Sequence, residues 1–233
     1  MTIRRSAFVM SITPFAANGA LDEPAYRAHL RRLCAAGVGV YVGGSASGEG
    51  FSLSPEERDR VLAIAIEELK GKVPVRAMGC EVRHLAETLD YLQATAPHAL
   101  DAVHVFAPEM GHASKPTTAE LETYYGAAIA ATAHRVVLST YQALGFDVPV
   151  ALLERLVARF PQIAGFFYGG TDARYLSTVI ARLADRIEIH CAGPYNALTT
   201  LGLGGAGFMG HEGNLSPELP ARVIAAFERG DLA

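Results

Sequence analysis

Polar side chains lie at or near the ends of several short apolar segments of the chain. They are Ser47, Glu109, Tyr141, Tyr168, His190, His211 and Glu212. A hydroxyl group and a general base held together can enolise a carbonyl compound, and such acid–base help contributes roughly 10²–10⁴-fold to a rate. These residue types therefore indicate proton-transfer chemistry, provided that the fold brings the segment ends together.

Some of these side chains are also of types that bind divalent metal ions. The candidate ligands are Glu109, His112, His190, His211 and Glu212. Their spacing along the chain matches no recognised ligand motif, and scattered loop histidines are usually solvated. The sequence therefore predicts neither a metal site nor a bound cofactor.

The segments that carry these residues alternate with helix-like stretches. Eight candidate strands are short and apolar, as strands covered on both faces should be. They span residues 7–13, 39–43, 75–79, 102–107, 136–140, 164–168, 188–192 and 207–210. This alternation predicts a single α/β domain over residues 1–233, a (β/α)₈ TIM barrel. An open doubly wound sheet is the alternative, but "ITPFAANG" after the first strand is not a glycine-rich phosphate loop.

Capping residues mark where the helices should begin. Ser54 and Glu57 are three residues apart and predict a capping box, and Thr117 and Glu120 repeat the pattern before a later helix. Ser216 is the predicted cap of the last helix. Each predicted helix start also marks the end of the loop before it, where the polar residues lie.

Composition excludes several classes of function. A net charge of −4 leaves no basic surface for nucleic acid, and no apolar run reaches the roughly 18–20 residues that span a bilayer. The cysteines are scattered and form no CxxC pair, so we expect reduced thiols in a cytoplasmic protein. The lysines are few: Lys70, Lys72 and Lys115.

Several stretches give the chain a resemblance to a known family. "ITPFAANGALD", "GVGVYVGGSASGEGFSLSPEER", "PQIAGFFYGGTD" and "GGAGFMGHEGNLSPEL" resemble motifs of the dihydrodipicolinate synthase and N-acetylneuraminate lyase family. The resemblance covers essentially the whole chain. It implies a TIM barrel that binds pyruvate or a related 2-oxo acid as a Schiff base and makes or breaks a carbon–carbon bond. It also implies that the substrate lies at the C-terminal ends of the strands.

The substrate-binding residues that the family uses are only partly present. The turn that holds the substrate carboxylate falls on residues 45–49, where Ala46 replaces one hydroxyl residue and Ser47 keeps the other. The Schiff-base lysine position falls on Phe167, and no lysine lies on a late strand. Phenylalanine has no nucleophilic group, so we expect no imine with pyruvate, and Lys115 is interpreted as a helix-entry residue.

The proton-relay tyrosine of the family is also replaced. Its position falls on Leu138 or, with a one-residue deletion, on Ser139, and Tyr141 follows shortly afterwards. The polar residue after the glycine of the seventh strand becomes Pro194. The candidate catalytic residues are Ser47, Tyr141 and Tyr168, and the candidate substrate-binding residues are Ala46, Ser47, Phe167, Gly193 and His211.

Two functions remain open. The first is a lyase or aldolase-type enzyme for a small 2-oxo or hydroxy acid that works without a lysine imine. The second is a catalytically silent barrel that binds a small acid or serves as a structural subunit. A polar mouth with perturbed titratable groups favours the enzyme. A cavity plugged by Phe167 and Tyr168 favours the silent barrel.

The chain stops at "ERGDLA", just past the predicted eighth helix. The resembled family usually continues with extra C-terminal helices, so we expect either a minimal version or a fragment. The tetrameric assembly of the family is therefore not assumed for this chain, although some self-association into a homo-oligomer is expected.

Overall fold

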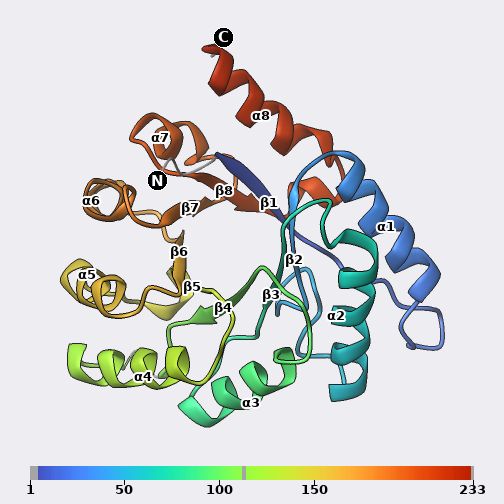
Figure 1. Ribbon diagram of the computed structural model, residues 1–233, viewed down its shortest axis with the longest axis horizontal. Coiled ribbons are helices and arrows are strands. Elements are labelled where there is room, and N and C mark those ends of the chain that lie inside the picture. The colour runs from blue at the N-terminus through green and yellow to red at the C-terminus, as the bar shows by residue number, and fades with distance from the viewer. Residues whose placement is uncertain (1–4, 112–113, 232–233) are drawn as a thin grey trace.

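The computed structural model describes residues 5–111 and 114–231. Within them, eight parallel strands form a closed barrel in chain order (Figure 1). They are β1 Ser6–Met10, β2 Gly39–Val42, β3 Val75–Met78, β4 Ala102–Phe106, β5 Val136–Tyr141, β6 Ile163–Gly169, β7 Glu188–Ala192 and β8 Gly207–Gly210. The predicted (β/α)₈ TIM barrel is confirmed, and the open sheet is excluded because β8 pairs with β1.

Helices surround the barrel, one after each strand (Figure 1). They are α1 Glu23–Ala35, α2 Pro55–Leu69, α3 Leu85–Thr95, α4 Thr118–Ala130, α5 Val150–Arg159, α6 Ala173–Leu183, α7 Ala197–Gly202 and α8 Glu218–Arg229. Two short 3₁₀ helices, η1 Gln142–Leu144 and η2 Glu212–Asn214, precede α5 and α8.

The helix starts follow the capping signals with one exception. Both predicted capping boxes are present, at the starts of α2 and α4. The prediction for Ser216 is wrong, because α8 begins only at Glu218 and has no side-chain cap in the described residues. The backbone N–H of Ser216 instead donates to the carbonyl of Glu212, which continues the turn of η2.

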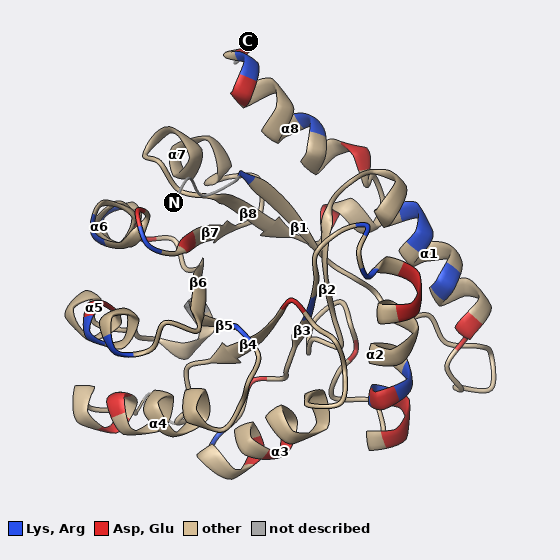
Figure 2. Cartoon of the chain, viewed as in Figure 1, with Lys and Arg blue, Asp and Glu red and all other residues tan. Residues whose placement is uncertain are grey.

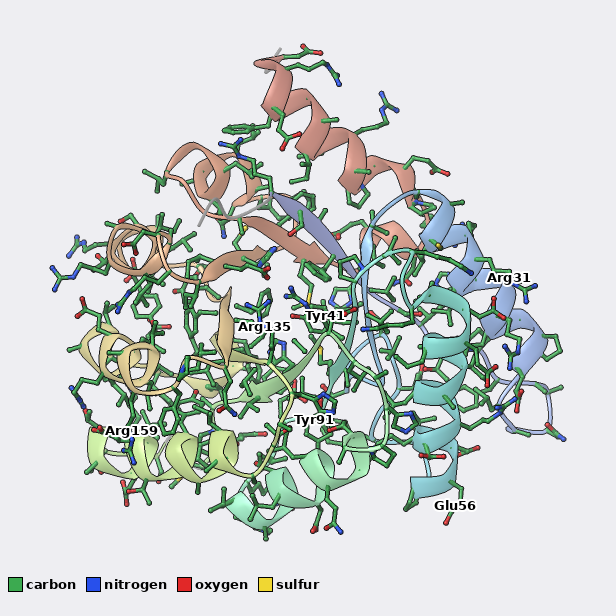
Figure 3. The ribbon with its side chains drawn as sticks, in the orientation of Figure 1. Arg31, Tyr41, Glu56, Tyr91, Arg135 and Arg159 are labelled. Atoms are coloured by element: carbon green, nitrogen blue, oxygen red, sulfur yellow. The ribbon has the colours of Figure 1, made fainter. Side chains whose placement is uncertain are left out.

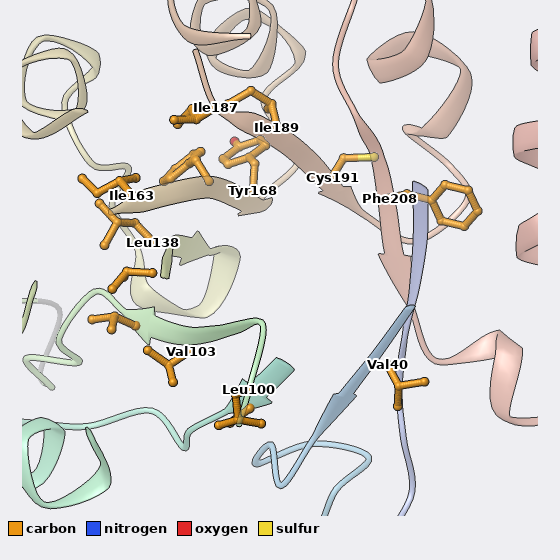
Figure 4. Packing of buried hydrophobic residues seen from close by; sticks show 14 of the residues in the cluster. Val40, Leu100, Val103, Leu138, Ile163, Tyr168, Ile187, Ile189, Cys191 and Phe208 are labelled. Atoms are coloured by element: carbon orange, nitrogen blue, oxygen red, sulfur yellow. The ribbon is translucent and has the colours of Figure 1, made fainter. Parts of the chain in front are cut away.

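Alternating side chains on the strands separate two apolar cores. Outward residues such as Val40, Leu138 and Tyr168 pack between the sheet and the helices (Figure 4). Inward residues pack inside the barrel, and they include Tyr41, which Figure 3 labels. This inner cluster consists of Phe8, Tyr41, Met78, Ala102, Phe106, Val137, Phe167 and Met209. The interior is therefore a packed core and not a channel.

Polar side chains cross the lower part of this interior. Arg76 of β3 donates to Glu188 of β7, with Nη2 2.6 Å from Oε2. The Arg76 guanidinium also lies over the ring of Phe8, 4.2 Å from its centroid. Because β3 and β7 are four strands apart in an eight-stranded barrel, this ion pair spans its full width.

Most other charges lie on the helices around the outside (Figure 2). Glu68 of α2 accepts hydrogen bonds from Arg31 and Arg27 of α1, and these bonds lower its pKa to about 2. The pairing joins the first two helices of the outer layer. Over residues 5–111 and 114–231, no helix is long and apolar enough to cross a membrane.

Candidate active site

The turn after β2 is shaped by close backbone approach. A Cβ on Gly48 would lie 2.6 Å from the backbone N of Gly44, so no larger residue fits there. Thr13 Oγ1 donates to the carbonyl of Gly48 at 2.7 Å. Glu49 follows with a φ of 55°, the one positive φ among the described non-glycine residues. The turn is therefore held rigidly at the C-terminal end of the barrel, and it carries Ser47.

His211, which follows β8, meets Ser47, which follows β2, and both of these strands pair with β1. A hydrogen bond joins Ser47 Oγ to Nδ1 of His211, although the residues are 164 positions apart. Partial desolvation lowers the pKa of His211 although its side chain remains exposed, and the nearby Glu212 carboxylate opposes this effect only in part. The imidazole is therefore neutral near pH 7 and can accept the Ser47 proton.

Gly193 lies beside the loop of His211. It has a φ of 57°, and its N–H donates to the carbonyl of Met209 at 2.7 Å. A Cβ on Gly193 would lie 3.7 Å from Oε1 of Glu212. The Glu212 carboxylate therefore lies over the ends of β7 and β8, next to His211.

Tyr141, at the end of β5, borders a pocket at the mouth. The pocket has a volume of about 340 Å³, and its lining residues are Ser45, Ala46, Phe51, Glu81, Glu109 and Tyr141. Burial raises the pKa of Tyr141, and the Glu81 and Glu109 carboxylates add to this effect. The phenol therefore stays protonated and can donate a proton. Ser47 directly follows Ala46, which also lines this pocket.

Phe167 closes the barrel interior below the mouth. It faces inward from β6, is 7% exposed, and has its ring centroid 5.8 Å from that of His104. Its neighbour on β5 is Ser139, whose buried Oγ has no hydrogen-bond partner in the described residues. Leu138 points outward into the other core. Of the two residues that the sequence left open at this place on β5, only Ser139 faces the interior.

Tyr168 does not share the interior with Phe167. Its ring is buried in the outer core, and its hydroxyl accepts the N–H of Asp172 at 3.0 Å. It borders a second pocket of about 180 Å³, which Tyr141 and Asp147 also line. The structure thus brings Ser47 to His211 and Tyr168 to Tyr141, and Tyr141 lines both pockets.

All three lysines lie in the described residues, and none is on a strand. Lys70 Nζ is 2.5 Å from Oδ1 of Asp101, and Lys72 Nζ donates to the carbonyl of Glu68 at 2.8 Å. Lys115 is exposed in the loop before α4. No lysine side chain therefore reaches the barrel interior.

The candidate metal ligands do not form a cluster. Within residues 5–111 and 114–231, no three His, Cys, Asp or Glu side chains lie close enough together to hold a metal ion. His112 lies outside the described residues. His190 is buried inside the barrel, with its Nε2 2.9 Å from Oγ of Ser6. Glu109, in contrast, is exposed to solvent.

Two residues of the mouth escaped the sequence analysis. Glu81 lines the larger pocket, and its place three residues after β3 was the signal that could have identified it. Asn214 contacts the backbone of His211 through its side-chain amide. Its other partners lie near the start of the chain, at Met10, Ile12 and His29, and no local pattern indicates those contacts.

Comparisons with known proteins agree with this fold. A model of the dihydrodipicolinate synthetase family matches residues 4–233. The chain is 33% identical over 225 residues to a 4-hydroxy-tetrahydrodipicolinate synthase of Hyphomonas neptunium, which covers 95% of this chain and 74% of the relative.

Solved structures show the same architecture. A prophage protein of the dihydrodipicolinic acid synthase family from E. coli K12, solved with pyruvate, matches with a TM-score of 0.87 and 27% identity, over 98% of this chain and 76% of that one. A dihydrodipicolinate synthase of Bacillus anthracis matches in fold with a TM-score of 0.89 and 21% identity, over 99% and 78% of the two chains. The chain belongs to the dihydrodipicolinate synthetase family.

Proposed function

We propose that this protein converts a small 2-oxo or hydroxy acid by lyase or aldolase-type chemistry that uses no lysine imine. The observation that carries the proposal is the hydrogen bond between Ser47 and His211 at the barrel mouth. A neutral His211 takes up a proton through Ser47, and the protonated Tyr141 donates to the oxygen that becomes an enol.

The environment of Phe167 supports the absence of an imine. The family resemblance places the Schiff-base lysine at this position on β6, and the side chain here is an inward-facing phenyl ring. Enolisation must therefore rely on hydrogen-bond donors and a general base, without the electron sink of a protonated imine.

The charges of the mouth limit the substrate. Glu81 and Glu109 line the pocket, and like charges at close range repel. One carboxylate can be held by backbone N–H groups of the turn around Ser47, but a second would face these two glutamates. The proposed substrate is therefore a monocarboxylate such as pyruvate and not a dicarboxylate.

Proton exchange tests the proposal without knowledge of the physiological product. The protein is incubated with pyruvate in D₂O, and loss of the methyl proton signal is followed by NMR, with 2-oxoglutarate as the dicarboxylate comparison. We expect exchange with pyruvate that falls roughly 10²-fold in Ser47→Ala and His211→Gln. Ser177→Ala, on the exposed face of α6, is the control. The absence of exchange with every monocarboxylate tried would refute the proposed chemistry.

Borohydride trapping tests the second part of the proposal. With pyruvate and borohydride, the intact mass of the protein should stay unchanged, because no lysine side chain reaches the interior. A stoichiometric adduct on Lys115, or on either other lysine, would show that imine chemistry persists.

A catalytically silent small-acid binder is the second candidate, and the burial of Phe167 favours it. In that case pyruvate would raise the melting temperature of the protein but would cause no proton exchange. The melting temperature and the proton exchange, both measured with pyruvate, therefore separate the two functions.

A further inference from the structure

We propose that Asn214 is a positioning residue, which fixes the loop after β8 so that the His211 imidazole meets Ser47, and that His29 and Arg32 lock the orientation of its amide. The inference rests on the proposed function, in which Ser47 and His211 form the proton-transfer pair. Its test, however, reads the histidine ring directly and needs no substrate.

The Asn214 side chain uses its full hydrogen-bonding capacity. Its Nδ2 donates to the carbonyl of Met10 at 2.7 Å and to that of His211 at 2.9 Å. Its Oδ1 accepts the N–H of Ile12 at 3.2 Å and lies 2.9 Å from Nε2 of His29. One amide thus ties the His211 loop to the end of β1 and to α1.

Arg32 determines the direction of these bonds. A guanidinium only donates, and Arg32 Nη2 lies 3.3 Å from Nδ1 of His29, so this Nδ1 must be an acceptor. The ring proton of a neutral His29 is then on Nε2, where it donates to Oδ1 of Asn214. Burial lowers the pKa of His29; the hydrogen bond to Asn214 opposes this only in part, and the charge of Arg32 lowers the pKa further, so the ring stays neutral. Arg32 also donates to the backbone carbonyls of Asn214 and Leu215.

Removal of the amide should release the loop that carries His211. In Asn214→Ala, the carbonyls of Met10 and His211 both lose their donor. In Asn214→Asp, the shape is kept, but a carboxylate oxygen faces the same two carbonyls and repels them. Both variants should therefore break the hydrogen bond between Ser47 and His211, although neither substitution touches either ring or hydroxyl.

Long-range ¹H–¹⁵N NMR of the imidazole rings tests the proposal. The protein has eight histidines, and His211→Gln identifies the signals of His211. We expect the His211 ring signals in Asn214→Ala and Asn214→Asp to move to the positions that they take in Ser47→Ala. Proton exchange of pyruvate should fall at least tenfold in the same variants.

Three controls separate positioning from a general loss of stability. Thr95→Ala removes a buried hydroxyl bond elsewhere and should leave the His211 signals unchanged. His29→Gln can still donate to Asn214 and should keep the parent signals, whereas His29→Leu should lose them. These two variants keep the test valid if Asn214→Ala does not fold.

Parent-like His211 signals in a folded Asn214→Ala or Asn214→Asp would overturn the proposal, as would parent-like signals in His29→Leu. If the parent exchanges no protons with pyruvate, the proposed function fails, but the ring signals still decide the role of Asn214.

Discussion

Phe167 and Ser139 lie side by side on neighbouring strands and have opposite characters. The phenyl ring completes the inner apolar cluster, whereas the serine hydroxyl is buried without a partner in the described residues. An unsatisfied buried hydroxyl costs about 1–3 kcal/mol. The family resemblance places the Schiff-base lysine at Phe167, and of its two possible positions for the relay tyrosine only Ser139 faces the interior, so we expect the scaffold to admit an amine at position 167.

Phe167→Lys should restore imine formation with pyruvate. The new amine would be surrounded by apolar side chains and the Ser139 hydroxyl, and desolvation would lower its pKa and increase its neutral, nucleophilic fraction. Borohydride trapping followed by intact mass should show one adduct at position 167. Loss of the packed ring should lower the unfolding free energy by about 2–4 kcal/mol in urea titrations.

Phe167→Leu is the matched control for that substitution, because it removes the ring without adding an amine. A folded Phe167→Lys protein that forms no adduct at high pyruvate would contradict the assignment of position 167 to the imine site. Turnover should remain poor even with the adduct, because Ala46 and Ser139 do not restore the missing hydroxyl and phenol.

At the scale of elements, the turn between β2 and α2 decides where Ser47 lies. The turn depends on glycines whose Cβ positions are occupied by other backbone atoms. It is also held by the bond from Thr13 to the carbonyl of Gly48. A disturbance of this turn should therefore reach His211 through Ser47.

Gly48→Ala should displace the turn and break the bond between Ser47 and His211. The added methyl group would lie within 3 Å of backbone atoms of Gly44, which are unable to rotate away. We expect a loss of about 1–3 kcal/mol in unfolding free energy, together with a shift of the His211 ring signals. Gly202→Ala is the control, because nothing lies within 4 Å of its added Cβ. Unchanged His211 signals in Gly48→Ala would contradict this role of the turn.

The elements themselves could be predicted well from local signals. Each strand lies within three residues of its predicted limits, because short apolar runs and capping boxes are written into neighbouring residues. Which side chains of a strand point into the barrel interior was harder to predict. Phe167 and Tyr168 are adjacent, so only one can point inward, and the sequence placed both at the mouth. The contacts of Asn214 were out of reach, because its bond to Met10 spans 204 positions.

At the scale of the whole molecule, the barrel interior holds two histidines that resist protonation. Burial, and secondarily the charge of Arg76, lower the pKa of His104 and of His190 to about 3. In the unfolded chain a histidine titrates near 6.5, so between these values the unfolded state binds more protons. Their contribution to stability is therefore complete above about pH 6.5 and is lost as the pH falls toward 3.

His104→Phe should reduce this acid sensitivity. Between roughly pH 6 and 4, each histidine adds about 1.4 kcal/mol per pH unit to the slope of the unfolding free energy against pH. The variant removes the contribution of His104 to this slope. It also removes two ring nitrogens that have no partner in the described residues, so stability at pH 7 should rise. Urea titrations across this range measure both effects. Phe106→Leu, from the same cluster, should lose stability with an unchanged slope; an unchanged slope in His104→Phe would disprove the linkage.

The ion pair between Arg76 and Glu188 has a consequence for the order of folding. Its partners are 112 positions apart on β3 and β7, so it forms only when these two strands face each other from opposite sides of the barrel. A contact that is absent from the transition state affects unfolding and not refolding. Glu188→Gln should therefore speed unfolding roughly 10²-fold, as expected for about 3 kcal/mol, and leave the refolding rate nearly unchanged in stopped-flow measurements. A slower refolding rate would instead show that the barrel closes early.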